Sequence, residues 1–102
     1  MNEVATLSDD ELKQAVVTWS GRVNAGYAQL LLAIGEVDAR GTWNGYGVLS
    51  CAHWLGITLG MATVTAHEHV RVARKLRELP KVADAMVAGQ LSFSQTRAIT
   101  RI

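Results

Sequence analysis

The stretch SDDELKQAVVTWSGRVNAGYAQLLLAIGEVDAR, residues 8–40, decides the fold of this chain. It opens on Ser8 with Glu11 three residues later, a capping box in which each side chain can bond a free backbone N–H. Apolar or aromatic residues then recur at steps of three and four, the period of one helix face: Leu12, Val16, Trp19, Val23, Tyr27, Leu30, Ile34 and Val37. The pattern predicts one long helix that ends before the glycine-rich segment 41–47.

This apolar stripe has two interpretations. Its spacing is close to a heptad, so the eight residues are a candidate surface for a homo-oligomer. The interpretation that we favour is that the stripe packs on later helices of the same chain. Gly21, Gly26 and Gly35 interrupt the stripe. Each lowers helix stability by up to ~1 kcal/mol relative to alanine, or else allows close helix packing.

The segment after the long helix predicts a loop and then a helix-turn-helix. Residues 41–47 hold three glycines, which indicates a loop, and we expect Trp43 and Tyr46 to anchor it. Ala52 and Gly56 have the small-residue spacing of a helix-turn-helix, in which glycine lets the backbone turn. This spacing predicts a short helix from about residue 49 to 55, a turn at Gly56 and a second helix capped by Thr58.

Two more helices are predicted near the C-terminus. One runs from about Lys81 to Gly89, a residue type common just after a helix. The other begins at a second capping box, Ser92 with Gln95, and its periodicity reaches residue 102 without a stop signal. With no strand pattern, the predicted fold is all-α with about five helices: one long N-terminal helix, a helix-turn-helix-like pair and a C-terminal helix pair.

The length limits the number of domains, and the composition limits the class of protein. At 102 residues, the chain is a single all-helical domain or the truncated N-terminal part of one, with residues 1–7 expected to be flexible. Hydrophobic residues make up 49% and charged residues 19%, which excludes an intrinsically disordered chain. The N-terminus lacks a signal-peptide pattern, no apolar run is long enough to span a membrane, and Cys51 has no partner for an internal disulfide. We therefore expect a cytoplasmic protein that does not enter membranes.

The charge distribution suggests where a polyanion would bind. The net charge is only +1. However, residues 1–50 carry three basic and six acidic side chains, a balance of −3, whereas residues 51–102 carry seven basic and three acidic ones, a balance of +4. Such asymmetry can steer a polyanion to one end of a molecule.

The candidate DNA-binding residues lie on one predicted helix: Arg71, Arg74, Lys75 and Arg77. Together with His67, most of them share a face, and Lys and Arg bind phosphates whatever the base sequence. Glu78 lies on the same face and dilutes its charge. A solvated face whose cations complement the helix dipole is the alternative. Base reading is disfavoured, because the first turns of the second helix of the pair offer no Arg, Lys, Asn or Gln to base edges.

The chain carries no catalytic signature that we can identify. No His, Cys or acidic pair has the spacing that places two metal ligands on one helix face, and no serine has an adjacent base. We therefore predict no enzyme activity, no cofactor and no metal.

Several segments together resemble a known family. They are Trp54-Leu55, the segment from Val70 to Leu76, Leu79-Pro80, and Ala88-Gly89 with Leu91-Ser92. Taken together they are similar to the actinobacterial domain of unknown function 222, found in the thirteen-E-twelve repeat proteins. The resemblance implies an all-helical region, associated with mobile elements, that commonly precedes an HNH endonuclease domain. No HNH motif occurs in these residues, so no catalytic residue is carried over.

The functional expectation follows from the resemblance and the basic face together. We expect a non-catalytic helical remnant of the N-terminal region of an HNH endonuclease, which contacts double-stranded DNA through that face. The alternative is a helical oligomerisation or protein-interaction domain with no nucleic-acid role.

Overall fold

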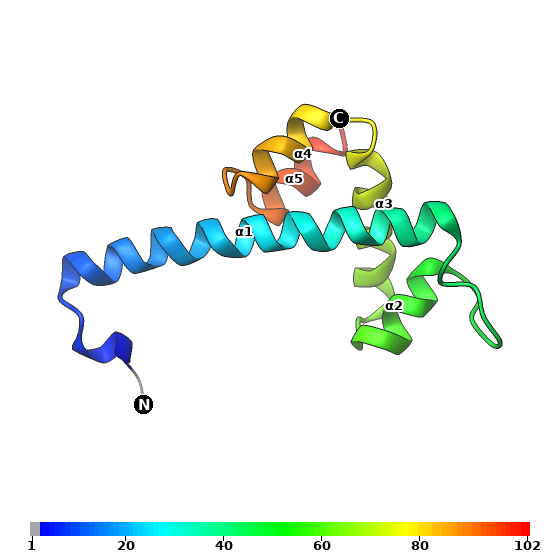
Figure 1. The fold of residues 1–102 in the computed structure, drawn as a ribbon, viewed down its shortest axis with the longest axis horizontal. Coiled ribbons are helices and arrows are strands. Elements are labelled where there is room, and N and C mark those ends of the chain that lie inside the picture. The colour runs from blue at the N-terminus through cyan, green and yellow to red at the C-terminus, as the bar shows by residue number, and fades with distance from the viewer. Residues whose placement is uncertain (1–2) are drawn as a thin grey trace.

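The structure, a computed structural model, describes residues 3–102 and is built of helices alone over that range (Figure 1). Its elements are the 3₁₀ turn η1 (Glu3–Thr6) and the helices α1 (Asp9–Arg40), α2 (Cys51–Leu59), α3 (Thr63–Leu76), α4 (Pro80–Val87) and α5 (Phe93–Ile99). The prediction of an all-α fold with about five helices is confirmed. Of the residues 1–7 that we expected to be flexible, 1–2 lie outside the described residues and 3–6 form η1.

The long helix α1 has the predicted boundaries for the predicted reason. The Ser8 hydroxyl accepts a hydrogen bond from the Glu11 backbone N–H, and the Glu11 carboxylate accepts one from the Ser8 N–H. These bonds satisfy backbone donors that have no partner within the helix. The helix ends at Gly41, which adopts a left-handed conformation with φ of 68°, a conformation that glycine reaches without steric cost.

The core forms where the C-terminal half of α1 meets the later helices. In Figure 1, α3 crosses α1 near its end, and α4 and α5 lie along its middle. Ala28, Leu31 and Ile34 of α1 are buried with residues of α2, α3 and α4, among them Leu55, Val72, Leu76 and Met86. Tyr27, Leu30 and Val37 pack against this core, so the C-terminal half of the stripe covers the chain's own helices.

The helix pair α2–α3 differs from the prediction. The prediction of a turn at Gly56 is wrong, because Gly56 lies inside α2 and its carbonyl accepts a hydrogen bond from the N–H of Gly60. The turn comes at Gly60, whose φ is 72°, and α3 begins at Thr63 rather than near Thr58. Gly56 has a packing role instead, since a Cβ there would lie 3.3 Å from the Met61 carbonyl oxygen.

The remaining connections are mostly as expected, with two corrections. Trp43 packs against the core, but Tyr46 is fully exposed and anchors nothing in its loop. The capping box at Ser92 is present. However, α5 ends at Ile99 instead of running to residue 102, because the N–H groups of Arg101 and Ile102 bond carbonyls three residues back rather than the four of an α-helix.

The molecule is elongated because the N-terminal part of α1 extends away from the core (Figure 1). The Cα radius of gyration is 16.2 Å, whereas a compact domain of this length has one of about 13 Å. We call residues 9–23 of α1 the arm. None of them is buried, and Val16, Trp19 and Val23 of the stripe are 60% exposed or more. Within residues 3–102, no helix has the length and apolar character needed to cross a membrane.

Candidate functional site

A cleft of about 380 Å³ lies between the start of α2 and the outer face of α3, and it gathers most of the predicted DNA-binding residues. Its α2 side consists of Ser50, Cys51 and Ala52; its α3 side consists of His67, Val70, Arg71, Arg74 and Lys75, with Glu78 just beyond α3. Three of the four predicted residues, Arg71, Arg74 and Lys75, therefore line one cleft together with His67. Glu78 lines it too, as the sequence pattern indicated.

Arg74 connects α3 to the long helix. Its Nε and Nη2 atoms donate to the two carboxylate oxygens of Asp38 at 2.7 and 2.9 Å. This two-point geometry is the strong form of an arginine–carboxylate pair. The hydrogen bonds from Arg74 lower the pKa of Asp38, and the carboxylate in turn raises the pKa of Arg74. The Asp38 side chain is only 13% exposed and the Arg74 side chain 65% exposed, so the guanidinium still reaches the cleft.

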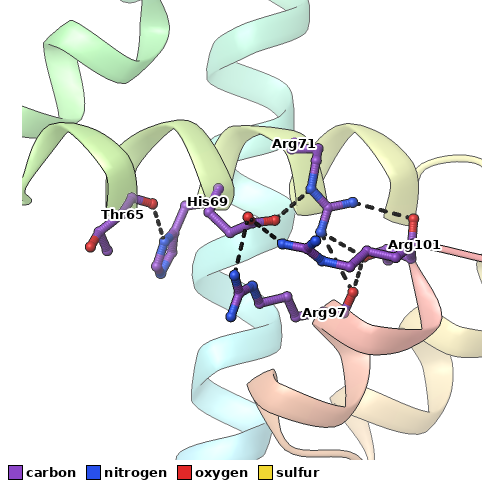
Figure 2. Close-up of polar contacts among 7 residues, drawn as sticks. Thr65, His69, Arg71, Arg97 and Arg101 are labelled. Carbon is purple, nitrogen blue, oxygen red and sulfur yellow. Dashed lines mark hydrogen bonds and ion pairs between the residues drawn. The ribbon is translucent and has the colours of Figure 1, made fainter.

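Arg71 connects α3 to the end of α5 (Figure 2). Its Nε donates to Glu68, and its terminal nitrogens donate to the carbonyl and hydroxyl oxygens of Thr100, each at 3.3 Å. Arg97 of α5 and Arg101, just beyond the end of α5, also pair with Glu68, at 3.4 and 3.0 Å. Three guanidinium groups thus surround one carboxylate, and the hydrogen bond from Arg71 is the main cause that lowers the pKa of Glu68.

Lys75 and Arg77 are placed differently. Lys75 pairs with Glu78 at 3.2 Å, one turn further along the chain, and both side chains are at least 41% exposed. Arg77 does not line the cleft, because it turns toward α1, where it donates to Glu36 at 2.9 Å and to the Gly35 carbonyl at 3.2 Å. Of the four predicted residues, Lys75 makes the fewest hydrogen bonds and ion pairs with other parts of the described chain.

The geometry of the cleft suits an anion. The first backbone N–H groups of a helix have no partner within the helix and carry a partial positive charge, and the first residues of α2 form one wall. Arg71, Arg74 and Lys75 form the other. The carboxylates of Glu68, Asp38 and Glu78 pair with these cations, so the net positive potential is smaller than three free cations would give.

The other histidines have structural roles. His69 is buried against Tyr27 and Phe93, and each pair of the three rings stacks with centroids 4.6–5.6 Å apart. Its Nδ1 lies 2.7 Å from the Thr65 carbonyl oxygen, which can only accept, so Nδ1 carries a proton, while Nε2 is hydrogen-bonded to the Tyr27 hydroxyl. His53 accepts the Leu49 N–H on its Nδ1 and so helps to cap α2.

Between residues 3 and 102, no three His, Cys, Asp or Glu side chains lie where they could hold a metal ion together. Cys51 is buried and burial raises the pKa of its thiol, which keeps it in the less nucleophilic protonated form.

Sequence reasoning missed the carboxylates that hold the arginines. Glu68 lies three residues before Arg71 on the same helix, so helical spacing alone could have identified it. Asp38 and Glu36 lie more than 30 residues from their arginine partners, and no local spacing indicates such a contact. Ser50 was missed as a cleft residue because α2 was expected to begin before it.

Comparison with known proteins identifies the family. No curated protein matches this chain, and no solved structure matches it. The family described as Domain of unknown function (DUF222) matches residues 12–102. That match covers the arm from Leu12, all of the core and both sides of the cleft, so the chain belongs to this family of domains of unknown function.

Proposed function

We propose that this domain is a non-catalytic helical module that contacts the phosphates of double-stranded DNA through the cleft between α2 and α3. The observation that carries the proposal is the gathering of Arg71, Arg74 and Lys75 opposite the start of α2 in one cleft. Phosphate oxygens are bound by such cations and by the N-terminal ends of helices. Arg77 has no part in this contact, since it is bound to α1.

The chemistry of the cleft favours backbone contact over base reading. Each cation shares its charge with a carboxylate, so we expect weak binding that falls steeply with salt. The cleft offers no Asn or Gln, the side chains that read adenine, and its arginines are held by Asp38 and Glu68. Binding should therefore vary little with DNA sequence.

The biological context in the proposal comes from the resemblance. Family members commonly precede an HNH nuclease domain in proteins associated with mobile elements. In such a protein, a helical module that binds phosphates would hold DNA near the nuclease domain. That domain would be encoded by the same gene or by the ancestral gene from which this one derives. The proposal includes a cytoplasmic location, where the chain would meet DNA.

The test is fluorescence anisotropy of a labelled random duplex titrated with the domain at low and at moderate salt. Lys75→Gln removes a cleft cation without breaking a contact between helices, whereas Lys81→Gln removes an exposed lysine outside the cleft. We expect Lys75→Gln to weaken binding several-fold and to reduce the salt slope by about one, and Lys81→Gln to change little. Glu78→Gln should strengthen binding, because it removes the carboxylate that pairs with Lys75.

Two results would contradict the DNA proposal. One is the absence of wild-type binding at low salt. The other is an equal loss for Lys75→Gln and Lys81→Gln, which would indicate attraction by overall charge rather than by the cleft.

A second candidate function is protein interaction through the arm. It is favoured by one specific observation: the half of the apolar stripe that lies on the arm is exposed, whereas the other half is packed.

A further inference from the structure

The arm of α1 presents an apolar surface that helices α2 to α5 leave uncovered. Val16 is 70% exposed, and Trp19 and Val23 are each 60% exposed. Beside them lies an apolar hollow of about 360 Å³, with Val4 of η1 on one side and the arm residues Leu12, Val16 and Trp19 on the other. A contiguous exposed apolar surface of this kind marks an interaction site.

We propose that the arms of two copies of this chain pack against each other in antiparallel orientation, through Leu12, Val16, Trp19 and Val23. The proposal does not depend on the DNA contact, since the arm and the cleft share no residue. It concerns the N-terminal half of the stripe only, because the C-terminal half is occupied by the chain's own core.

The spacing of the four residues is self-complementary. Their steps are four, three and four, a pattern that reads the same in both directions along the helix. Two antiparallel arms centred between residues 17 and 18 therefore place Leu12 opposite Val23 of the second copy and Val16 opposite Trp19. Each layer pairs a larger with a smaller side chain, as knobs-into-holes packing requires.

Charge complementarity selects the antiparallel orientation. The charged residues of the arm are Asp9, Asp10, Glu11 and Lys13 near its start and Arg22 near its end, where the guanidinium lies over the Trp19 ring. Parallel arms would place the acidic first turns of both copies side by side. In the antiparallel pair, the acidic turn of one copy lies near Arg22 of the other. Glu11 and Arg22 are eleven residues apart, about three full turns, so they lie on the same flank of the stripe.

The core of each copy does not obstruct this contact. The loop between α4 and α5 meets α1 at Gly21, where a Cβ on Gly89 would come within 2.7 Å of the Gly21 carbonyl oxygen. Gly21 lies two residues from Trp19 and from Val23, and at 100° per residue it faces away from the stripe. Over residues 12–23 the core and the second arm would therefore lie on different sides of α1, and the core takes the stripe face only from Tyr27 onward.

The size of the contact predicts a weak dimer. Residues 12–23 span only about 17 Å of helix, so the buried area falls at the low end for a specific interface. We expect a monomer–dimer equilibrium at laboratory concentrations rather than a permanent dimer.

The first experiment is sedimentation equilibrium of the purified domain over a wide range of concentration. We expect the wild-type mass to rise with concentration toward that of a dimer, and Trp19→Glu to remain monomeric because a charge would be buried in the contact. Tyr46→Glu is the matched control, since Tyr46 is a fully exposed aromatic residue outside the arm. It should behave as the wild type. Circular dichroism verifies that both variants are folded.

The second experiment tests the orientation in a Cys51→Ala background. Chains with Leu12→Cys and chains with Val23→Cys are mixed under mild oxidation. Antiparallel pairing predicts a disulfide between the two kinds of chain, because their altered positions face each other. It predicts no disulfide between two Leu12→Cys chains, because those positions lie about 17 Å apart along the axis, beyond the Cα separation that a disulfide spans.

Three results would overturn the proposal. A wild-type monomer at every concentration would show that the arm serves another partner or none. Dimers of Trp19→Glu equal to those of the wild type would place the contact elsewhere. Efficient self-linking of Leu12→Cys would show parallel arms.

Discussion

The two halves of α1 carry the same sequence pattern, but one half packs on the core and the other half is left outside it. From Tyr27 to Val37 the apolar stripe packs on the core, and Ile34 of the stripe is buried there. From Leu12 to Val23 the stripe continues with the same period, yet no residue of the arm is buried. The difference teaches that periodicity identifies which face of a helix is apolar, but the rest of the chain decides what covers that face. The later helices extend over only one half of α1.

The largest expected effect is on the stability of the fold, and it distinguishes the packed half of α1 from the arm. Leu31→Ala should lower the free energy of unfolding by about 2–5 kcal/mol, because it leaves a cavity in the core. Val16→Ala should leave the monomer unchanged or stabilise it by up to about 0.7 kcal/mol, since alanine is the better helix former and Val16 packs on nothing in the core. Urea unfolding followed by circular dichroism at low protein concentration measures both.

The same pair of variants also connects the arm to the proposed dimer. If Val16→Ala becomes destabilising only when the protein concentration is raised, the arm is buried by association. A large destabilisation by Val16→Ala at low concentration would contradict the description of the arm as uncovered.

The second prediction concerns the charged connection that only the packed half possesses. Asp38→Asn removes the carboxylate that accepts both bonds of Arg74, and we expect a loss of about 1–2 kcal/mol. Asp84→Asn, an exposed aspartate of α4, is the control and should change stability by less than about 0.5 kcal/mol.

The Asp38 contribution should also depend on pH with a definite sign. Arg74 lowers the pKa of Asp38 in the folded state, so the unfolded chain, with an aspartate pKa of about 3.9, binds the proton more readily. The stabilisation is therefore complete above pH ~4–5 and is lost as the pH falls through the lowered folded pKa. The stability difference between wild type and Asp38→Asn should shrink on acidification, and a constant difference would contradict this origin.

Local signals in the sequence predicted the parts of the fold that local chemistry determines. The capping boxes at Ser8 and Ser92 and the long helix between Ser8 and Gly41 follow from residues close together in sequence, and all are present. The prediction of a turn at Gly56 was wrong because glycine has two uses: it lets the chain turn, and it lets another backbone segment approach closely. Only the contact with the Met61 carbonyl, five residues on across the turn between α2 and α3, reveals which use applies.

The candidate site was predictable to the same extent. Helical spacing correctly placed His67, Arg71, Arg74 and Lys75 on one face. It could not show that Asp38 and Glu36 of α1 would meet Arg74 and Arg77, because those pairs form only when α3 crosses α1. Sequence therefore located the cations but not the carboxylates that hold them.

The smallest expected effect tests whether the exposed side of α1 is free. Gly26 lies in the middle of α1, is exposed, and would have no atom within 4 Å of an added Cβ. Gly26→Ala should therefore stabilise the monomer by up to about 1 kcal/mol, the helix-propensity difference. Gly41→Ala, measured in the same urea titration, should have the opposite sign, because Gly41 has a φ of 68° that alanine adopts only with strain. A destabilising Gly26→Ala would show that another surface packs closely on this side of α1 in solution.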